Sequence, residues 1–190
     1  MIADLVRKNR SYRRFYQDEA IDMATLRELV DLARLSPSSR NAQPLKYILS
    51  CDRETNAKIF STLTWAAFLK DWPGPAEGER PSAYIIVLND WEITPSVFCD
   101  HGIAAQSILL GAVERGLGGC ILSNVHKRHL AQEFKLTDRY EILLVIALGK
   151  PREEVAIEPL PADGDTKYWR DANDGHHVPK RSLDEIILQV

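Results

Sequence analysis

A cluster of basic side chains near the N-terminus is the first feature that could do chemistry. Five of the eight residues at positions 7–14 are Lys or Arg, although the chain of 190 residues has a formal charge of −3. Guanidinium groups offer paired donors to a phosphate, and the hydroxyl of Ser11 adds another. A second basic pair, Lys180-Arg181, could converge on the same anion. A solvated helix end or a membrane-surface contact remains an alternative for the cluster.

A polar turn between two prolines is the second candidate. Positions 37–44 read Pro-Ser-Ser-Arg-Asn-Ala-Gln-Pro, between an expected helix and an expected strand. Small hydroxyls and amides on a rigid turn can hydrogen-bond the edge of a planar heterocycle. A plain helix-capping turn would have the same composition, so the sequence leaves both interpretations open.

The histidines and cysteines form no pattern that indicates a metal site or a reactive thiol. His126 and His129 lie three apart without an acidic or thiol partner at metal-ligand spacing, and the adjacent pair His176-His177 points in different directions. Three cysteines without CxxC spacing or an activating neighbour are interpreted as free, buried thiols in a reducing compartment: Cys51, Cys99 and Cys120. We therefore predict no metal and no thiol catalysis.

Alternating helices and strands must position these candidates. Apolar spacing predicts helices over 21–35, 55–69, 100–115 and 127–134, and strands over 47–49, 83–88, 120–122 and 140–148. The helix at 100–115 carries little charge, so it must be covered on several sides, here or by a second subunit. This order of elements predicts an α+β fold of three layers around one central sheet.

Composition and length narrow the class of protein. The chain is 45% hydrophobic and 27% charged, which suits one packed domain over 1–190, with the polar segment 152–190 as a C-terminal arm. The longest apolar run, 142–148, is too short to span a membrane, and early charges interrupt any signal-peptide core. We expect a soluble, cytoplasmic protein. The segment Trp72–Pro81, rich in Pro and Gly, is a candidate lid.

Taken together, these motifs resemble the FMN-dependent nitroreductase family. The similarity runs in order along nearly the whole chain. It comprises Arg-Ser-Tyr-Arg-Arg-Phe at 10–15, the turn at 37–44, Asp100 with its apolar helix, Gly-Leu-Gly-Gly-Cys at 116–120, Gly-Lys-Pro at 149–151, and the basic tail pair. The resemblance implies a three-layer fold with a mostly antiparallel sheet. It also implies a homodimer with FMN at the interface, each site drawing on both chains.

The resemblance also implies roles for individual residues. Arg10 and Ser11 would hold the flavin phosphate with Lys180 and Arg181, and Arg13 would be the catalytic cation near the pyrimidine side of the ring. Contacts to the flavin edge or ribityl chain are implied for four turn residues: Ser38, Ser39, Asn41 and Gln43. Contacts near the flavin N5 are implied for Leu122, Ser123 and Asn124. Ser123-Asn124 and Asn9 depart from the family's usual glycine and arginine at those places.

The implied function is an NAD(P)H-dependent flavin oxidoreductase. Hydride would pass from NADH or NADPH through flavin N5 to a small planar acceptor of nitroaromatic or quinone type, with ping-pong kinetics. A flavin-binding carrier or sensor without turnover is the first alternative. A nucleic-acid or membrane-surface protein using the basic N-terminal segment is the second, and the acidic total charge argues against it.

Overall fold

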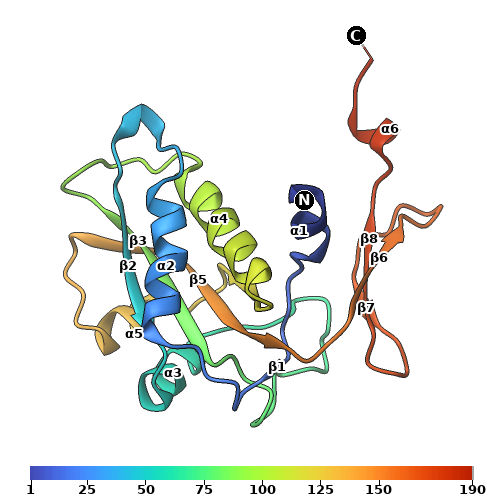
Figure 1. The fold of residues 1–190 in the computed structure, drawn as a ribbon, viewed down its shortest axis with the longest axis horizontal. Coiled ribbons are helices and arrows are strands. Elements are labelled where there is room, and N and C mark those ends of the chain that lie inside the picture. The colour runs from blue at the N-terminus through green and yellow to red at the C-terminus, as the bar shows by residue number, and fades with distance from the viewer. Residues whose placement is uncertain (190) are drawn as a thin grey trace.

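The protein is built around an antiparallel β-sheet (Figure 1). The computed structural model describes residues 1–189. The strand order is β1–β5–β3–β2, β4 also pairs with β5, and every pairing is antiparallel. The strands are β1 (Phe15–Tyr16), β2 (Leu45–Ser50), β3 (Ala83–Asp90), β4 (Gly118–Leu122) and β5 (Tyr140–Pro151). The predicted central antiparallel sheet is confirmed.

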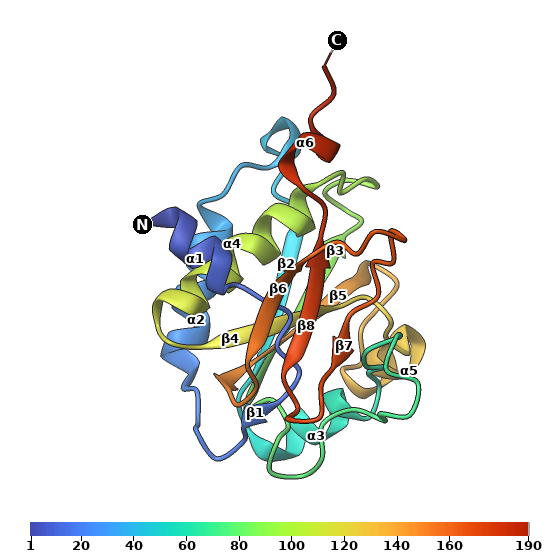
Figure 2. The ribbon, with the colours of Figure 1, turned by 90° about the vertical axis from the view of Figure 1, so that its right-hand side faces the viewer.

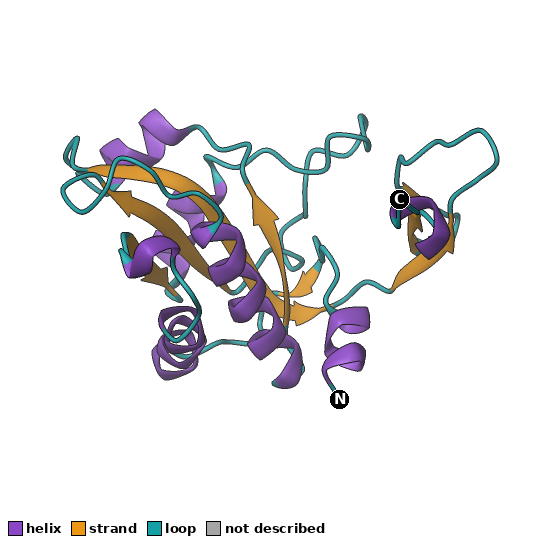
Figure 3. Cartoon of the chain, turned by 90° about the horizontal axis from the view of Figure 1, so that it is seen from above, coloured by secondary structure: helices purple, strands orange, loops and turns teal. Residues whose placement is uncertain are grey.

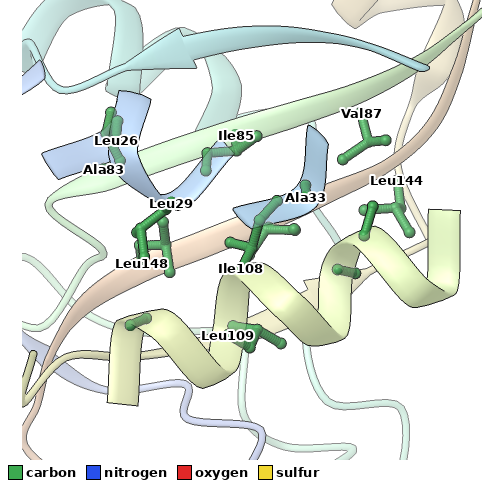
Figure 4. Close-up of a cluster of buried hydrophobic side chains, with 14 of the residues drawn as sticks. Leu26, Leu29, Ala33, Ala83, Ile85, Val87, Ile108, Leu109, Leu144 and Leu148 are labelled. Atoms are coloured by element: carbon green, nitrogen blue, oxygen red, sulfur yellow. The ribbon is translucent and has the colours of Figure 1, made fainter. Parts of the chain in front are cut away.

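Helices cover both faces of this sheet, which gives the three predicted layers. On one face pack α2 (Met23–Arg34) and α4 (Asp100–Glu114), and Figure 4 shows Leu29 and Ile108 directed at the strands. The other face is covered by α3 (Arg53–Phe60) and α5 (Lys127–Glu133), through Ile59 and Leu130. Burial of these apolar side chains is the main stabilising term for the layers.

Strand β3 lies in the middle of the sheet and explains why its sequence is apolar throughout. All eight of its residues are buried. Because side chains alternate along a strand, Ile85 and Val87 face the layer of α2 and α4, while Tyr84 and Ile86 face the opposite layer. The expected strand buried on both faces is therefore present.

The C-terminal segment contains a second, smaller sheet. Here β8 (His176–Lys180) pairs in parallel with β6 (Val155–Pro159) and antiparallel with β7 (Trp169–Arg170). Figures 2 and 3 show this sheet beside the main body, followed by the short helix α6 (Leu183–Ile186). The chain begins with α1 (Ile2–Lys8), close to α4. The single domain with an arm over 152–190 stays a prediction, and the arm has strands that the sequence did not indicate.

Two details of the sequence analysis are wrong. The helix expected over 55–69 ends at Phe60 because the Thr62 hydroxyl donates to the Ile59 carbonyl and Ala66 has a φ of 42°. The three cysteines are free, but burial applies to Cys120 alone, since Cys99 is exposed and Cys51 is half-buried.

The candidate lid, Trp72–Pro81, is tied to the rest of the protein. Arg14 makes two hydrogen bonds to the Glu79 carboxylate, of 2.9 and 2.6 Å, and the Arg170 guanidinium lies 4.3 Å from the Trp72 ring centroid. These contacts oppose free movement of the segment. Within residues 1–189, no helix has the length and apolarity to cross a membrane. The cytoplasmic location stays a prediction.

Candidate functional site

A cavity of about 290 Å³ lies between the start of the chain, α4, β4 and the C-terminal strands. It brings together four residues proposed from the sequence as phosphate or flavin ligands: Arg10, Ser11, Arg13 and Lys180. The other residues that line it are Asn9, Gln106, Leu109, Gly119, Ile121, Tyr168, His176 and Val178. Segments from both ends of the chain therefore build one site.

Backbone pairing fixes the floor of this cavity. Ser11 forms a parallel bridge to Gly119, and the Tyr12 N–H donates to the Gly119 carbonyl at 3.0 Å. A Cβ atom at Gly119 would lie 2.5 Å from the Ala147 carbonyl oxygen, so a side chain there would displace β4 from β5. The glycine lets β4 lie directly against β5, and the basic segment pairs with β4 at this residue.

The charge of the cavity is positive. Arg10, Arg13 and Lys180 line it, and none of its lining residues is acidic. The Nε atoms of Arg10 and Arg13 are buried without a hydrogen-bond partner among residues 1–189. A phosphate ester accepts hydrogen bonds from guanidinium, ammonium and hydroxyl groups, so the residues that line the cavity fit the charged end of FMN.

A buried carboxylate outside the cavity orients the basic segment. Glu153, 8% exposed, accepts hydrogen bonds from the backbone N–H groups of Arg13 and Arg14 and from Arg170 Nη2 at 2.9 Å. Since its oxygens are used in this way, Glu153 holds the backbone and leaves the Arg13 guanidinium free to point elsewhere.

The Arg13 guanidinium is held in one orientation. Its Cζ lies 4.7 Å from the Tyr168 ring centroid, and its Nη1 donates to the Ser11 carbonyl at 3.2 Å and meets His176 Nε2 at 3.3 Å. Burial, then the charges of Arg13 and Arg170, lower the pKa of His176 to about 4. His176 is therefore neutral near pH 7, and because arginine only donates, Nε2 accepts and the proton sits on Nδ1.

The polar turn adopts an ordered shape around Asp100. Ser38 Oγ and the Ser39 N–H donate to the Asp100 carboxylate at 2.5 and 2.9 Å, and the Gln43 N–H donates to Ser38 Oγ at 2.9 Å. Asn41 and Gln43 have φ values of 54° and 52°, a left-handed geometry that side chains disfavour and that such contacts must hold.

Within one chain, the turn and the basic cluster do not share a cavity. Ser38 and Gln43 line a separate cavity of about 180 Å³ beside Tyr47 and Asp100. Ser39 and Asn41 lie in the same turn, as the short 3₁₀ helix Ser39–Asn41. Their proposed flavin contacts stay predictions.

Four other predicted ligands lie outside the basic cavity. Leu122 is packed into the core beneath α5, and Ser123 and Asn124 are exposed beyond the end of β4. Arg181 pairs with Glu185 at 3.1 Å. The side chain of Lys180, by contrast, lies on the same strand face as His176 and Val178. The flavin contacts of these four residues stay predictions.

Comparison with known proteins identifies the family of this chain. The model of the nitroreductase family matches residues 6–150. The chain belongs to the nitroreductase family. The match covers the basic cluster, the polar turn and all five strands of the main sheet except the last residue of β5. The resemblance drawn from the sequence motifs is thus confirmed.

Curated relatives agree with this family. A protein of Archaeoglobus fulgidus, provisionally named an NADH dehydrogenase/NAD(P)H nitroreductase, is 27% identical over 74% of this chain and 80% of its own. YfhC of Bacillus subtilis, provisionally named an NAD(P)H nitroreductase, is 25% identical over 83% of this chain and 88% of its own.

Solved structures of nitroreductase-family proteins share the fold. One from Streptococcus pneumoniae has a TM-score of 0.71 and 17% identity, with both chains covered completely. A structure titled as an FMN-dependent nitroreductase of Clostridium difficile has a TM-score of 0.65 and 24% identity, over 81% of this chain and 89% of that one. The nitroreductase-like α+β architecture is therefore shown.

Sequence reasoning missed several residues of the basic cavity. Tyr168, His176 and Val178 come from the arm, and Gln106 comes from the face of α4 beside α1, where it accepts from Asn9 Nδ2 at 3.2 Å. The sequence signal that could have found the arm residues is the spacing of two along a strand, which places His176, Val178 and Lys180 on one face of β8. A strand assigned to this polar segment would have revealed it.

Proposed function

We propose that this nitroreductase-family protein is an FMN-dependent oxidoreductase. It takes hydride from NADH or NADPH and passes it to a small planar acceptor of nitroaromatic or quinone type in a ping-pong sequence. The family match and the nicotinamide-linked names of two relatives support this class of reaction. The observation that carries it is the acid-free cavity in which Arg10, Arg13 and Lys180 meet around Ser11.

The residues of this cavity would bind and orient the cofactor. Arg10, Ser11 and Lys180 would hold the phosphate through charge-assisted hydrogen bonds. FMN supplies the redox chemistry when bound. Arg13, already fixed by Tyr168 and His176, would place a positive charge that needs no reorientation during the reaction.

A homodimer would complete the site. Apolar side chains on α1 and α4 are exposed, including Ile2 at 64% and Ile103 at 37%. Pairing two copies would cover this surface, and it would allow the Ser38–Gln43 turn of one copy to approach the basic cavity of the other. This arrangement explains why the two groups of predicted ligands line separate cavities within one chain.

The proposal is tested by the colour and reactivity of the purified protein. FMN should be bound, and anaerobic mixing with NADH or NADPH should bleach its visible absorbance, which an added quinone or nitroaromatic should restore. A protein that binds FMN but is not bleached by either donor is the carrier or sensor instead. A protein that binds no FMN on reconstitution contradicts the proposal.

The phosphate role of Arg10 is tested by substitution. Arg10→Ala should weaken FMN binding by about tenfold or more, since it removes a charged hydrogen-bond donor worth about 1.5–3 kcal/mol. Arg7→Ala is the matched control, because Arg7 is exposed and pairs with Asp4 at 3.4 Å. Equal FMN dissociation constants for Arg10→Ala and the wild type would remove Arg10 from the site.

A further inference from the structure

His176 is a buried side chain of the arm whose hydrogen-bonding capacity is only half used. The residue lies on β8, among those that line the basic cavity, and is 1% exposed. Its Nε2 meets Arg13 Nη1 at 3.3 Å, while its Nδ1 is buried without a hydrogen-bond partner among residues 1–189. A buried polar atom without a partner costs about 1–3 kcal/mol, which an apolar side chain at the same place would avoid. This cost indicates a role for the imidazole, and the contact of Nε2 with Arg13 is the candidate.

The contact with His176 restricts how the Arg13 guanidinium can be placed. Nη1 carries two N–H groups, and they face two acceptors, the Ser11 carbonyl at 3.2 Å and His176 Nε2. The Tyr168 ring packs on both groups, with its centroid 4.7 Å from Arg13 Cζ and 5.1 Å from the His176 ring centroid. Nη2, in contrast, makes no hydrogen bond within residues 1–189 and is not among their buried unpaired atoms. The guanidinium is thus held at Nη1 and stays open at Nη2.

The hydrogen bond between Arg13 and His176 requires a neutral imidazole. An arginine only donates, so a protonated Nε2 would set one N–H against another at 3.3 Å. The charged groups around the ring oppose its protonation: Arg13 from the N-terminal segment, Arg170 from the paired strand β7, and His177 next along β8. Glu153 accepts from the Arg13 backbone and from Arg170, and makes no hydrogen bond to the ring. Burial, and then the three positive charges, lower the pKa of His176.

The adjacent His177 has the opposite environment and serves as a comparison. Side chains alternate along a strand, so His177 faces away from the side of β8 that carries His176. Its Nδ1 lies 2.8 Å from the Glu158 carboxylate and its Nε2 lies 3.1 Å from that of Asp171. These hydrogen bonds raise the pKa of His177, first through Glu158 and then through Asp171. Of two neighbouring histidines, one is thus stabilised as a cation and the other as a neutral acceptor.

We propose that His176 is a positioning residue for the flavin reaction. Through Nε2 it fixes Nη1 of Arg13 and keeps Nη2 available to a cofactor in the basic cavity. The inference rests on the proposed function, in which Arg13 supplies a charge that is already oriented. It adds a condition to that function, because protonation of His176 removes the acceptor and releases Arg13. Reduction of the flavin should therefore slow in acid through a residue that does not itself contact the flavin.

The tautomer of His176 tests the hydrogen bond without any turnover of the flavin. The protein is labelled with ¹⁵N-histidine and studied with and without FMN, because long-range ¹H–¹⁵N NMR spectra distinguish protonated from unprotonated ring nitrogens. At pH 7 the His176 signals, assigned by their loss in His176→Gln, should show a neutral ring with its proton on Nδ1. Arg13→Ala should raise the pKa of His176, because a nearby positive charge is removed. A proton on Nε2, or an unchanged titration in Arg13→Ala, contradicts the proposal.

Variants that remove or keep the acceptor test its effect on Arg13. His176→Phe retains an aromatic ring without an acceptor, and it should slow bleaching of bound FMN by NADH or NADPH about tenfold. Its FMN dissociation constant should stay within about threefold of the wild type, which also shows that the variant folds. His176→Gln places an acceptor near the position of Nε2 and should recover most of the rate. In an Arg13→Ala background, His176→Phe should slow bleaching by less than about twofold, because His176 acts through Arg13.

The pH profile separates positioning from a merely structural role. In pH-jump stopped flow, the wild-type bleaching rate should fall as the pH drops toward the His176 pKa of about 4, and His176→Gln should lack this fall. His177→Gln is the matched control on the other face of β8 and should keep it. Equal rates for His176→Phe and the wild type, or additive effects of His176→Phe and Arg13→Ala, overturn the proposal. A wild type that holds FMN but is not bleached overturns the proposed function instead, and the tautomer of His176 still decides whether the hydrogen bond exists.

Discussion

At the scale of single residues, Arg13 shows how packing holds a charged group in one orientation. Its guanidinium lies over Tyr168, its Nη1 contacts the Ser11 carbonyl and His176, and Glu153 holds its backbone. Each contact removes a rotational freedom that a surface arginine keeps. A charge fixed before the reaction begins stabilises developing negative charge without the cost of reorienting solvent.

Arg13→Ala should slow reduction of bound FMN more than it weakens FMN binding. We expect the rate at which NADH or NADPH bleaches the flavin to fall by about 10- to 100-fold, because a preorganised charge is lost. Stopped-flow absorbance measures the rate, and flavin titration measures binding. Arg13→Lys should recover part of the rate, since the positive charge remains. Equal bleaching rates for Arg13→Ala and the wild type would contradict the assigned role.

His176 should make stability depend on pH. Its pKa is lowered from the ordinary 6.5 to about 4, so between these values the unfolded chain binds a proton that the folded protein does not. Stability is therefore fully present above pH 6.5 and falls as the pH drops toward 4. His176→Asn removes this contribution. Urea unfolding at pH 7 and pH 5 should show the wild type losing about 1–2 kcal/mol more than the variant. An equal loss in both proteins would exclude His176 as the source.

Residue chemistry predicted the centre of the basic cavity better than its walls. Arg10, Ser11 and Lys180 could be proposed as phosphate ligands because basic residues cluster beside them in a chain whose net charge is negative. Leu122 was carried over from motif order and Arg181 from its place in the basic pair 180–181, and neither argument shows where a side chain points. Leu122 is used in the core and Arg181 in a pair with Glu185. Tyr168 carries no charge signal and was therefore missed.

At the scale of elements, the Trp72–Pro81 segment connects the main sheet to the arm. The Glu79 carboxylate accepts two hydrogen bonds from the Arg14 guanidinium and lies 3.7 Å from Arg152. The hydrogen bonds from Arg14, with the charges of both arginines, lower the pKa of Glu79. Arg170 from β7 covers Trp72. The segment is thus tied to the arm by charged and aromatic contacts, and a role as a lid stays a prediction.

Glu79→Gln should destabilise the protein. Both Arg14 and Glu79 side chains are less than one-fifth exposed, at 18% and 15%, so the two-point ion pair is poorly solvated once broken. We expect a loss of about 1–3 kcal/mol in urea unfolding. Glu77→Gln is the matched control. Its pairs with Arg53 and Arg80 are more exposed, since the Glu77 side chain is 56% exposed, and their loss should cost less than about 1 kcal/mol. Equal costs for the two variants would show that Glu79 is not an anchor.

The spacing of apolar residues located most helices and strands of the main body, but it did not locate their ends or the strand pairing within the C-terminal arm. The helix at 21–35 is present as α2, because Leu26, Leu29 and Ala33 recur on one buried face. The helix at 55–69 was extended too far, since apolar residues continue past Phe60 in turns that local spacing does not distinguish. The parallel pairing of β6 with β8 joins residues about twenty apart, and polar sequence carries no sign of it.

At the scale of the whole molecule, several large apolar side chains are exposed on the surface of the single chain. Ile2, Val6 and Ile103 are exposed on α1 and α4, and the tail after β8 exposes Leu183, Ile186, Ile187 and Leu188. Large apolar side chains gathered on neighbouring elements are typical of association surfaces. The helix 100–115 was expected to need cover on several sides, from its own chain or from a second subunit, and no sequence signal identifies which surface supplies it.

Ile103→Lys should separate the proposed homodimer and weaken FMN binding together. A charge in the middle of an apolar interface lacks a partner, so the mass measured by light scattering should shift from two chains to one. FMN affinity should fall by about tenfold or more, because each site would lose the residues contributed by the other copy. Met23→Lys is the control, since Met23 is similarly exposed, at 43% against 37% for Ile103, but lies at the start of α2. A variant that becomes monomeric yet binds FMN as tightly as the wild type would show that each site is complete within one chain.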